Sequence, residues 1–239
     1  MARTKDILEI KGLSAEIEGV QVLRKVDFAL AEGATVALIG RNGAGKTSLL
    51  RAIMGFMKVT AGAIAFDGRP LLEVKPHERP RLGIGYAPED RRLFSTFTIE
   101  ENIRLPAEVM KLGAPEIARR LDGIYAVLPE LADLRHRPAA GLSGGQGKMA
   151  ALARALMIGN RVILLDEPFQ GLAPVLANRY AAALRTLRDS HPEIALLITE
   201  SNPSLLRNFA ERAYAIERGE VTEVEGGLAA SSLAAAGMH

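Results

Sequence analysis

Residues 34–47 read ATVALIGRNGAGKT, and this stretch decides the fold. Residues 34–39 form an almost continuous apolar run, typical of a strand buried on both faces of a parallel sheet. The next eight residues match the pattern G-x-x-x-x-G-K-[ST] in full, and a helical segment is expected from 46 to about 56. A strand, a glycine-rich loop and a helix in this order predict an α/β core that binds phosphate.

The loop chemistry favours a nucleotide over a structural turn. Glycines let the backbone approach phosphate oxygens, and successive N–H groups at a helix N-terminus attract anions. Lys46 can reach the β and γ phosphates, and Thr47 can offer its hydroxyl to Mg²⁺. A glycine-rich turn with a chance lysine would not need a buried strand before it and a helix after it. The predicted nucleotide contacts are Gly40, Arg41, Asn42, Gly43, Ala44, Gly45, Lys46, Thr47 and Ser48.

Strand and helix patterns alternate on both sides of this loop. Apolar residues alternate at period two over much of the first thirty positions, with turns at Glu18-Gly19 and Glu32-Gly33. Between about 92 and 156 the spacing becomes helical, which indicates a helical insertion. Further strands are expected near 64–66, 84–87, 161–165 and 194–199, a helix at 174–188, and a closing hairpin around Arg218-Gly219. The pattern predicts a mostly parallel sheet.

A carboxylate pair follows one of the buried strands. Asp166 and Glu167 come directly after the apolar residues 162–165, where ligands of open α/β sheets bind. Asp166 is placed to hold Mg²⁺, and Glu167 to orient or deprotonate an attacking water. An acidic pair can also simply end a strand, but the phosphate loop upstream favours hydrolysis.

A second glycine-rich segment, residues 142–146, reads LSGGQ before an amphipathic helix. Ser143 and Gln146 have the spacing of a capping box, so helix initiation alone could explain these two residues. It does not explain Gly144 and Gly145, because glycine is unfavourable in a helical turn. Bare N–H groups at this helix start would form a second anion site.

Composition limits the remaining classes. The 239 residues include 48% hydrophobic and 24% charged residues, as in a globular protein with a full core. The absence of cysteine excludes disulfides and thiolate metal sites, and the net charge of +2 does not suggest a nucleic-acid surface. No run reaches the ~18 apolar residues of a membrane span, and no signal peptide is evident. We expect a cytoplasmic protein that reaches the inner face of a membrane only through partners.

The phosphate loop, the LSGGQ segment and the strand ending in Asp166-Glu167 together resemble the ATP-binding cassette family, in the order that family uses. The resemblance implies one nucleotide-binding domain over residues 1–239. Its fold would be a P-loop NTPase (RecA-like) core with an N-terminal antiparallel β subdomain, a helical signature subdomain (the insertion at 92–156) and an Ala/Gly/Ser-rich tail at 226–239. Two cassettes stack head to tail in that family. Ser143, Gly144, Gly145 and Gln146 would then contact ATP held by a second ATPase subunit, identical or sister.

Residues 86–102, the Gly171-Leu-Ala-Pro segment and Ile198-Thr-Glu-Ser-Asn are similar to ATP-binding subunits of branched-chain amino-acid importers. That resemblance implies integral membrane permeases as partners, and indirectly a solute-binding protein. It also makes Arg91, Arg92, Leu93 and Phe94 candidates for the permease interface, although a solvated basic pair followed by core residues is the alternative. The transported solute is not specified by any residue of this chain.

Several positions differ from the family pattern, among them Asp90, Phe169, Gln170 and the Gly147-Lys148 start of the signature helix, and three more bear on the nucleotide site. Ile17 stands where an aromatic residue usually stacks on adenine, so the base would pack only on an aliphatic side chain. Glu89 occupies the lid position and keeps an oxygen for Mg²⁺ or the lytic water. Ser201 occupies the switch position, where a histidine or glutamine is usual, and would reach the γ-phosphate through water.

Two alternatives stay open, the first of them because of Ile17 and Ser201. One is a catalytically weak, regulatory cassette paired with an active sister ATPase. The other is a cassette protein acting on nucleic acid or ribosomes, which the chain disfavours because it has one cassette and no basic arm.

Overall fold

The computed structural model describes residues 5–207 and 209–228 and separates into two compact units. The first unit contains the chain up to Arg79 and again from Ala195 onward. The second unit runs from Pro80 to Ile194 and includes the helical insertion expected at 92–156. In the described part of the chain, no helix has both the length and the apolarity needed to cross a bilayer.

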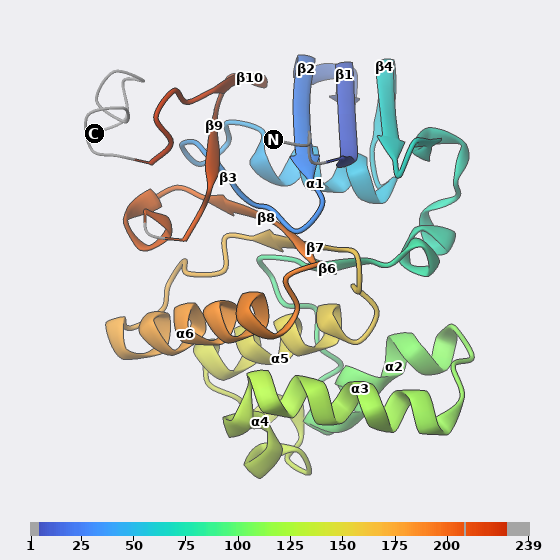
Figure 1. Ribbon diagram of the computed structural model, residues 1–239, viewed down its shortest axis with the longest axis vertical. Helices are drawn as coiled ribbons and strands as arrows, with labels where there is room; N and C mark the ends of the chain where they lie inside the picture. The colour runs from blue at the N-terminus through green and yellow to red at the C-terminus, as the bar shows by residue number, and fades with distance from the viewer. Residues whose placement is uncertain (1–4, 208, 229–239) are drawn as a thin grey trace. The chain divides into compact units, whose positions relative to one another are not determined.

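The first unit contains an antiparallel sheet with the strand order β2-β1-β4-β5 (Figure 1). Its strands are β1 (Asp6–Ile17), β2 (Val20–Ala31), β4 (Lys58–Phe66) and β5 (Arg69–Pro70). Ile10 lies opposite Phe28 on one side and Ile64 on the other, and all three side chains are buried. The expected antiparallel β region is therefore present, and in β2 the alternating residues Val26, Phe28 and Leu30 are buried as the period-two pattern predicts.

A second group of strands in this unit carries the phosphate loop. β3 (Thr35–Ile39) pairs in parallel with β8 (Ala195–Glu200) and β9 (Arg212–Glu217), and β10 (Glu220–Glu223) closes the expected hairpin against β9. Every residue of β3 and β8 is buried, as their continuous apolar sequences predict. Strand ends in this group differ from the sequence prediction by one or two residues, whereas β4 begins at Lys58, six residues before the strand expected near 64–66. The unit also contains the 3-10 turns η1 (Leu71–Glu73) and η4 (Pro203–Leu206).

Helix α1 (Lys46–Met54) ends earlier than the sequence analysis expected. Gly55 follows it in the left-handed conformation (φ 80°), which terminates the helix two residues before Phe56. The buried Arg79 guanidinium then donates to the carbonyls of Ala52 (3.0 Å) and Ile53 (2.5 Å). Because the last carbonyls of a helix have no partners within it, Arg79 supplies donors for α1 from 26 residues further along the chain.

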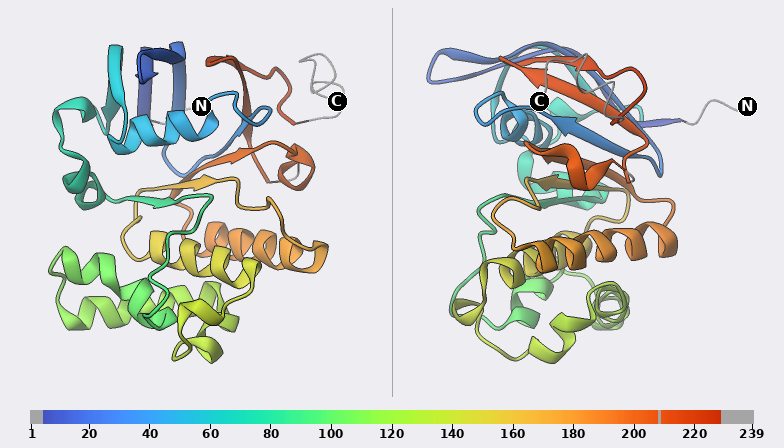
Figure 2. Two further views of the ribbon diagram at one scale, coloured as in Figure 1. Left: turned by 180° about the vertical axis from the view of Figure 1, so that it is seen from behind. Right: turned by 90° about the vertical axis from the view of Figure 1, so that its left-hand side faces the viewer.

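The second unit combines a parallel strand pair with helices, and the chain enters it through η2 (Pro76–Leu82). β6 (Ile84–Ala87) pairs with β7 (Val162–Asp166), with Ala87 opposite Leu165. Helices α5 and α6 lie side by side in both views, and α2 and α3 pack as neighbours (Figures 1 and 2). The helices are α2 (Ile99–Val109), α3 (Ala114–Val127), α4 (Pro129–Leu134), the 3-10 turn η3 (Ala139–Gly141), α5 (Gly144–Leu156) and α6 (Pro174–Ser190).

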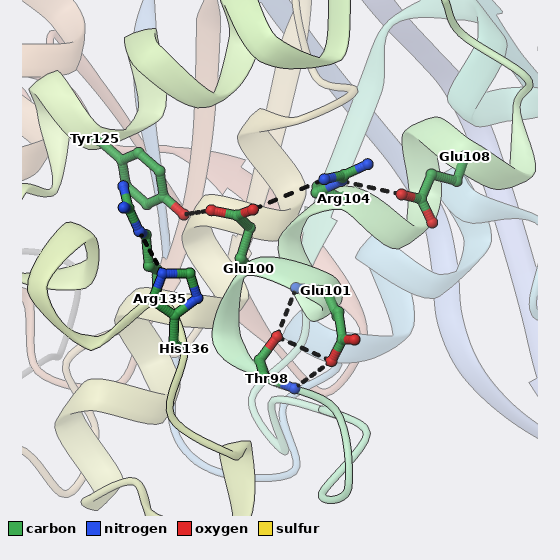
Figure 3. Close-up of polar contacts among 8 residues, drawn as sticks. All are labelled: Thr98, Glu100, Glu101, Arg104, Glu108, Tyr125, Arg135 and His136. Carbon is green, nitrogen blue, oxygen red and sulfur yellow. Dashed lines mark hydrogen bonds and ion pairs between the residues drawn. The ribbon is translucent and has the colours of Figure 1, made fainter. Parts of the chain in front are cut away.

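The helical insertion begins with a strong start signal. Thr98 caps α2, and its side chain and backbone both bond to Glu101, forming a capping box (Figure 3). Pro115 stands in the first turn of α3, as expected from the sequence. Of the tail, only residues 226–228 are described, and Leu228 is buried. The remainder of the predicted tail, 229–239, lies outside the described residues.

A hydrogen bond between two helices is expected to make the free energy of unfolding depend on pH. The Tyr125 hydroxyl of α3 donates to Glu100 of α2 at 3.0 Å, and Arg104 lies on the other side of Glu100 (Figure 3). Burial, followed by the bond to Glu100, raises the pKa of the Tyr125 hydroxyl. The unfolded chain loses this proton near its ordinary pKa of about 10, whereas the folded chain retains it to higher pH.

The free energy of unfolding is therefore expected to fall as pH rises above about 10. Tyr125→Phe should reduce this fall, because phenylalanine has no proton to retain. Urea unfolding of both proteins between about pH 8 and 11 checks the expectation. Tyr214 is present in both proteins, so its own titration cancels in the difference. Parallel pH curves for the two proteins would contradict the assignment.

Candidate functional site

The loop between β3 and α1 has the backbone of a phosphate cradle. Gly43 (φ 79°) and Gly45 (φ 117°) adopt conformations that other residues rarely take. A Cβ on Gly40 would lie 2.4 Å from the Ile216 carbonyl oxygen, so only glycine fits against β9. The three glycines of the sequence motif are thus required by local geometry, and α1 begins at the next residue, Lys46.

Lys46 is held over this loop although it is only 4% exposed. Its ammonium donates to the carbonyls of Gly40 (2.5 Å) and Arg41 (3.0 Å) and to the Ser201 hydroxyl (3.2 Å). Ser201 in turn donates to the Asn42 side chain at 2.7 Å. The structure therefore brings Ser201, which follows β8, to the phosphate loop, as its expected switch role requires.

This arrangement fits a nucleotide triphosphate. A buried ammonium whose partners include backbone carbonyls can exchange those neutral acceptors for charged phosphate oxygens, which form stronger hydrogen bonds. Residues 40–46 and the α1 N-terminus supply the donors. Ile17, the residue expected near the base, ends β1 and is 44% exposed beside Val20. It therefore presents an accessible apolar side chain without the aromatic surface usual at this position.

The carboxylate pair lies in the second unit, at the end of β7. Asp166 and Glu167 are 2% and 3% exposed. The Tyr86 hydroxyl of β6 lies 3.2 Å from an Asp166 oxygen. Glu167 has a left-handed backbone (φ 48°), and the Lys148 ammonium of α5 donates to its carbonyl. Positive φ is uncommon outside glycine, so the turn that aims Glu167 is maintained by surrounding contacts.

The parallel register also places Glu89 at this edge. Ala87 lies opposite Leu165, so the chain after β6 and the chain after β7 leave the sheet on the same side. Glu89 is exposed there. Among the described residues, no three acidic or histidine side chains gather as a metal site. The Asp166 carboxylate is the kind of hard oxygen ligand that Mg²⁺ prefers, and bound Mg²⁺ typically keeps several waters.

The LSGGQ segment forms the start of α5. Ser143 is the N-cap, accepting from the Gln146 N–H (3.3 Å) while its own N–H donates to the Gln146 side chain (3.0 Å). The capping-box explanation is therefore correct for these two residues. A Cβ on Gly145 would lie 2.5 Å from the Leu176 Cδ1 and 3.3 Å from its Cβ, so any larger residue there would have to displace the Leu176 side chain of α6. Gly144 is exposed, and packing does not explain it. The N-terminus of α5 is therefore accessible at this residue.

The model of the ABC transporter family matches residues 23–170. This chain belongs to the ATP-binding cassette family. Members of this family hydrolyse ATP in transport, and the cassette is accordingly an ATPase of the transporter class. The matched range contains the phosphate loop, the signature and the carboxylate pair.

Two relatives show how far the comparison reaches. The probable branched-chain amino acid transport ATP-binding protein LivF of Archaeoglobus fulgidus is 32% identical over 87% of each chain. The lipopolysaccharide export ATP-binding protein LptB of Acidithiobacillus ferridurans is also 32% identical, over 90% of this cassette and 88% of the relative. A branched-chain amino acid transport subunit and a lipopolysaccharide export subunit are equally similar, so sequence similarity does not decide the transported solute.

A solved structure supports the fold. The ADP conformation of MJ1267, an ATP-binding cassette of an ABC transporter, is 26% identical, covers 93% of this chain and 92% of its own, and has a TM-score of 0.80. The P-loop NTPase fold expected from the sequence is therefore confirmed.

Sequence reasoning missed three side chains that support the cassette's machinery. Tyr86 contacts Asp166, Lys148 contacts the Glu167 backbone, and Arg154 contacts the backbone of Arg91 and Arg92. The sequence contains one signal of this kind: Lys148 and Arg154 are basic residues in a mostly apolar helix. Their acceptors are backbone carbonyls, which no residue pattern reveals.

Proposed function

We propose that this cassette is the ATP-binding and hydrolysing subunit of an importer for branched-chain or other amino acids. Cassettes of this family work with membrane permease components. In this proposal ATP closes a dimer of cassettes, hydrolysis reopens it, and permease subunits convert the motion into solute movement. The observation that carries the nucleotide part is the buried Lys46 ammonium, bonded to Gly40, Arg41 and Ser201.

Each residue has one task in this proposal. Lys46 exchanges its carbonyl acceptors for the β and γ phosphates, and Ser201 reaches the γ-phosphate through water. Asp166, with Thr47 and Glu89, would hold Mg²⁺, which neutralises phosphate charge. Glu167 orients and deprotonates the attacking water.

The signature residues act on the nucleotide of a second cassette. Gly144 and the capped start of α5 supply N–H donors for its γ-phosphate. This cassette is therefore expected to work as a dimer, with itself or with a sister ATPase, at the inner face of a membrane. The amino-acid solute rests on similarity to LivF, and the similar LptB is an export subunit. Uptake measurements are needed to choose between them.

Lys46→Ala is expected to weaken ATP binding at least tenfold, because a charge-assisted hydrogen bond to phosphate contributes about 1.5–3 kcal/mol. Titration with a fluorescent ATP analogue in the presence of Mg²⁺ measures this. Lys58→Ala is the control, since Lys58 is an exposed lysine of the same unit that pairs with Glu16. Equal affinity of the Lys46 and Lys58 variants would overturn the loop assignment.

The transport part needs the assembled complex. The cassette is co-expressed with candidate permeases, extracted in detergent and reconstituted into vesicles. ATP should then drive the accumulation of leucine, isoleucine or valine on the side of the membrane that carries the cassettes. Ribosome co-sedimentation in place of permease co-purification would favour the nucleic-acid alternative. If the cassette binds ATP but does not hydrolyse it, alone or with permease, the regulatory alternative is favoured. Restored hydrolysis in Ser201→Gln would then attribute the lost turnover to Ser201.

A further inference from the structure

The segment after β6 has an unusual backbone. Arg91 (φ 62°) and Arg92 (φ 47°) are successive left-handed residues, although neither is glycine. Such a conformation is uncommon for one arginine and persists only when neighbouring contacts hold it. The segment 91–97, here called the arginine–phenylalanine segment, includes the residues the sequence analysis assigned to the permease interface.

Arg154 of α5 makes the contacts that hold this backbone. Its two terminal nitrogens donate to the carbonyls of Arg92 (Nη1, 2.6 Å) and Arg91 (Nη2, 2.6 Å). Burial lowers the pKa of the Arg154 guanidinium, whose forked geometry suits two adjacent acceptors. A lysine at this position could offer only a single point charge.

The Arg91 side chain of the segment in turn contacts α5. Arg91 extends to the start of α5, where its Nη1 lies 3.5 Å from the Gly144 carbonyl oxygen. A Cβ on Gly147 would lie 3.0 Å from the Arg91 Cδ, so the arginine stem packs over a glycine in the helix. Arg91 thus contacts the signature turn, while Arg154 from the same helix contacts the Arg91 backbone.

The other end of the segment is fixed as well. Asn102 of α2 is fully buried, accepts from the Phe94 N–H (2.8 Å) and donates to the Phe94 carbonyl (3.0 Å). Phe94 and Phe97 are 51% and 37% exposed, and their rings stack with centroids 5.3 Å apart. Asn102 also donates to the Phe97 carbonyl at the longer distance of 3.4 Å, so the segment is held at Arg91, Arg92, Phe94 and Phe97 and presents a paired aromatic surface.

We infer that Arg154 and Arg91 are positioning residues that make the arginine–phenylalanine segment and the signature turn move as one body. A force on the exposed phenylalanines would then shift Ser143–Gln146 without passing through the nucleotide. This inference rests on the proposed function, in which the segment meets a permease and the signature acts on a partner cassette's ATP. Neither arginine contacts a reacting atom in this scheme.

ATP-driven dimerisation tests the link between Arg91 and the signature. In a Glu167→Gln background, which slows hydrolysis, light scattering gives the ATP concentration for half-maximal dimer formation. Arg91→Ala is expected to raise it about fivefold, because the packing of the Arg91 stem over Gly147 and the long contact of its guanidinium with the Gly144 carbonyl (3.5 Å) are lost together. ATP-analogue binding to the monomer should change less than about twofold.

Arg119→Ala is the matched control. Arg119 is an exposed arginine of the same unit whose guanidinium donates to Glu116 on its own helix. It should leave both measurements unchanged. Equal dimerisation by the Arg91 and Arg119 variants would overturn the inference.

Hydrogen exchange of the nucleotide-free protein tests Arg154 separately. The Arg91 and Arg92 amides donate within the turn, to Pro88 (3.1 Å) and Asp90 (2.7 Å). Arg154→Lys should speed their exchange about tenfold while leaving the amides of β1 unchanged. Unchanged exchange would overturn the role of Arg154 in holding the Arg91–Arg92 backbone. If the Glu167→Gln protein stays monomeric in ATP, the proposed function fails. Hydrogen exchange alone still decides whether Arg154 holds this backbone.

Discussion

Replacing Glu167 with glutamine is expected to lower ATP turnover about a hundredfold while leaving ATP binding intact, because an amide cannot accept the proton of the attacking water. Glutamine has the size of glutamate and leaves the main-chain carbonyl to which Lys148 donates. The left-handed backbone at this residue (φ 48°) is therefore retained. Phosphate-release assays in Mg²⁺ measure turnover, and the fluorescent analogue measures binding.

The same variant should accumulate an ATP-bound dimer, because hydrolysis is the step that reopens it. Glu220→Gln, on the exposed face of β10, is the control and should turn over ATP like the unaltered protein. Turnover within about threefold of the unaltered protein would remove Glu167 from the role of base. Loss of ATP binding would instead mean that the substitution disturbed the fold of its turn.

Replacing Arg79 with methionine is expected to lower the free energy of unfolding by about 3 kcal/mol. The guanidinium donates to the carbonyls of Ala52, Ile53 and Val74, and all of these bonds are lost together. Methionine fills a similar volume, so the loss reports the missing guanidinium bonds more than an empty space, although the Ala52 carbonyl still accepts from the Gly55 N–H. Burial lowers the pKa of Arg79, yet the group stays charged at neutral pH.

Thermal unfolding provides the measurement. A loss of about 3 kcal/mol corresponds to a decrease of roughly 6–12 °C in Tm for a chain of this size. Arg81→Met is the control, because Arg81 is an exposed arginine whose bond to the Met110 carbonyl is long, at 3.4 Å. It should lower Tm by less than about 3 °C. Equal decreases in Tm for the two variants would show that the Arg79 bonds at the C-terminal end of α1 do not contribute to stability.

Local motifs were readable because their physics is local. Residues 40–47 form a phosphate loop wherever a buried strand precedes them and a helix follows, and Asp166 needs only the end of β7 to reach the ligand edge. Ser143 and Gln146 cap α5 within four residues. Such features depend on spacing along one short segment, and spacing is what a sequence displays.

The misjudged details have a different origin. Helix α1 was expected to continue to Phe56, whereas Gly55 ends it and Arg79 completes it from a distant turn. The two signature glycines looked equivalent, yet the Leu176 side chain of α6 explains Gly145 alone. Both outcomes depend on which element packs against which, and neighbouring residues carry no record of that.

By itself the sequence determined the family, the α/β fold class and the residues that meet phosphate, since each follows from a short pattern and the chemistry of its side chains. Only the tertiary structure decided how those residues are supported. Ser201 reaches Asn42 across 159 positions, and Arg154 reaches the Arg91 carbonyl across 63. The Arg154 contact leaves no pattern in the sequence of its acceptor, because every residue has a carbonyl and only the folded path of the chain selects one.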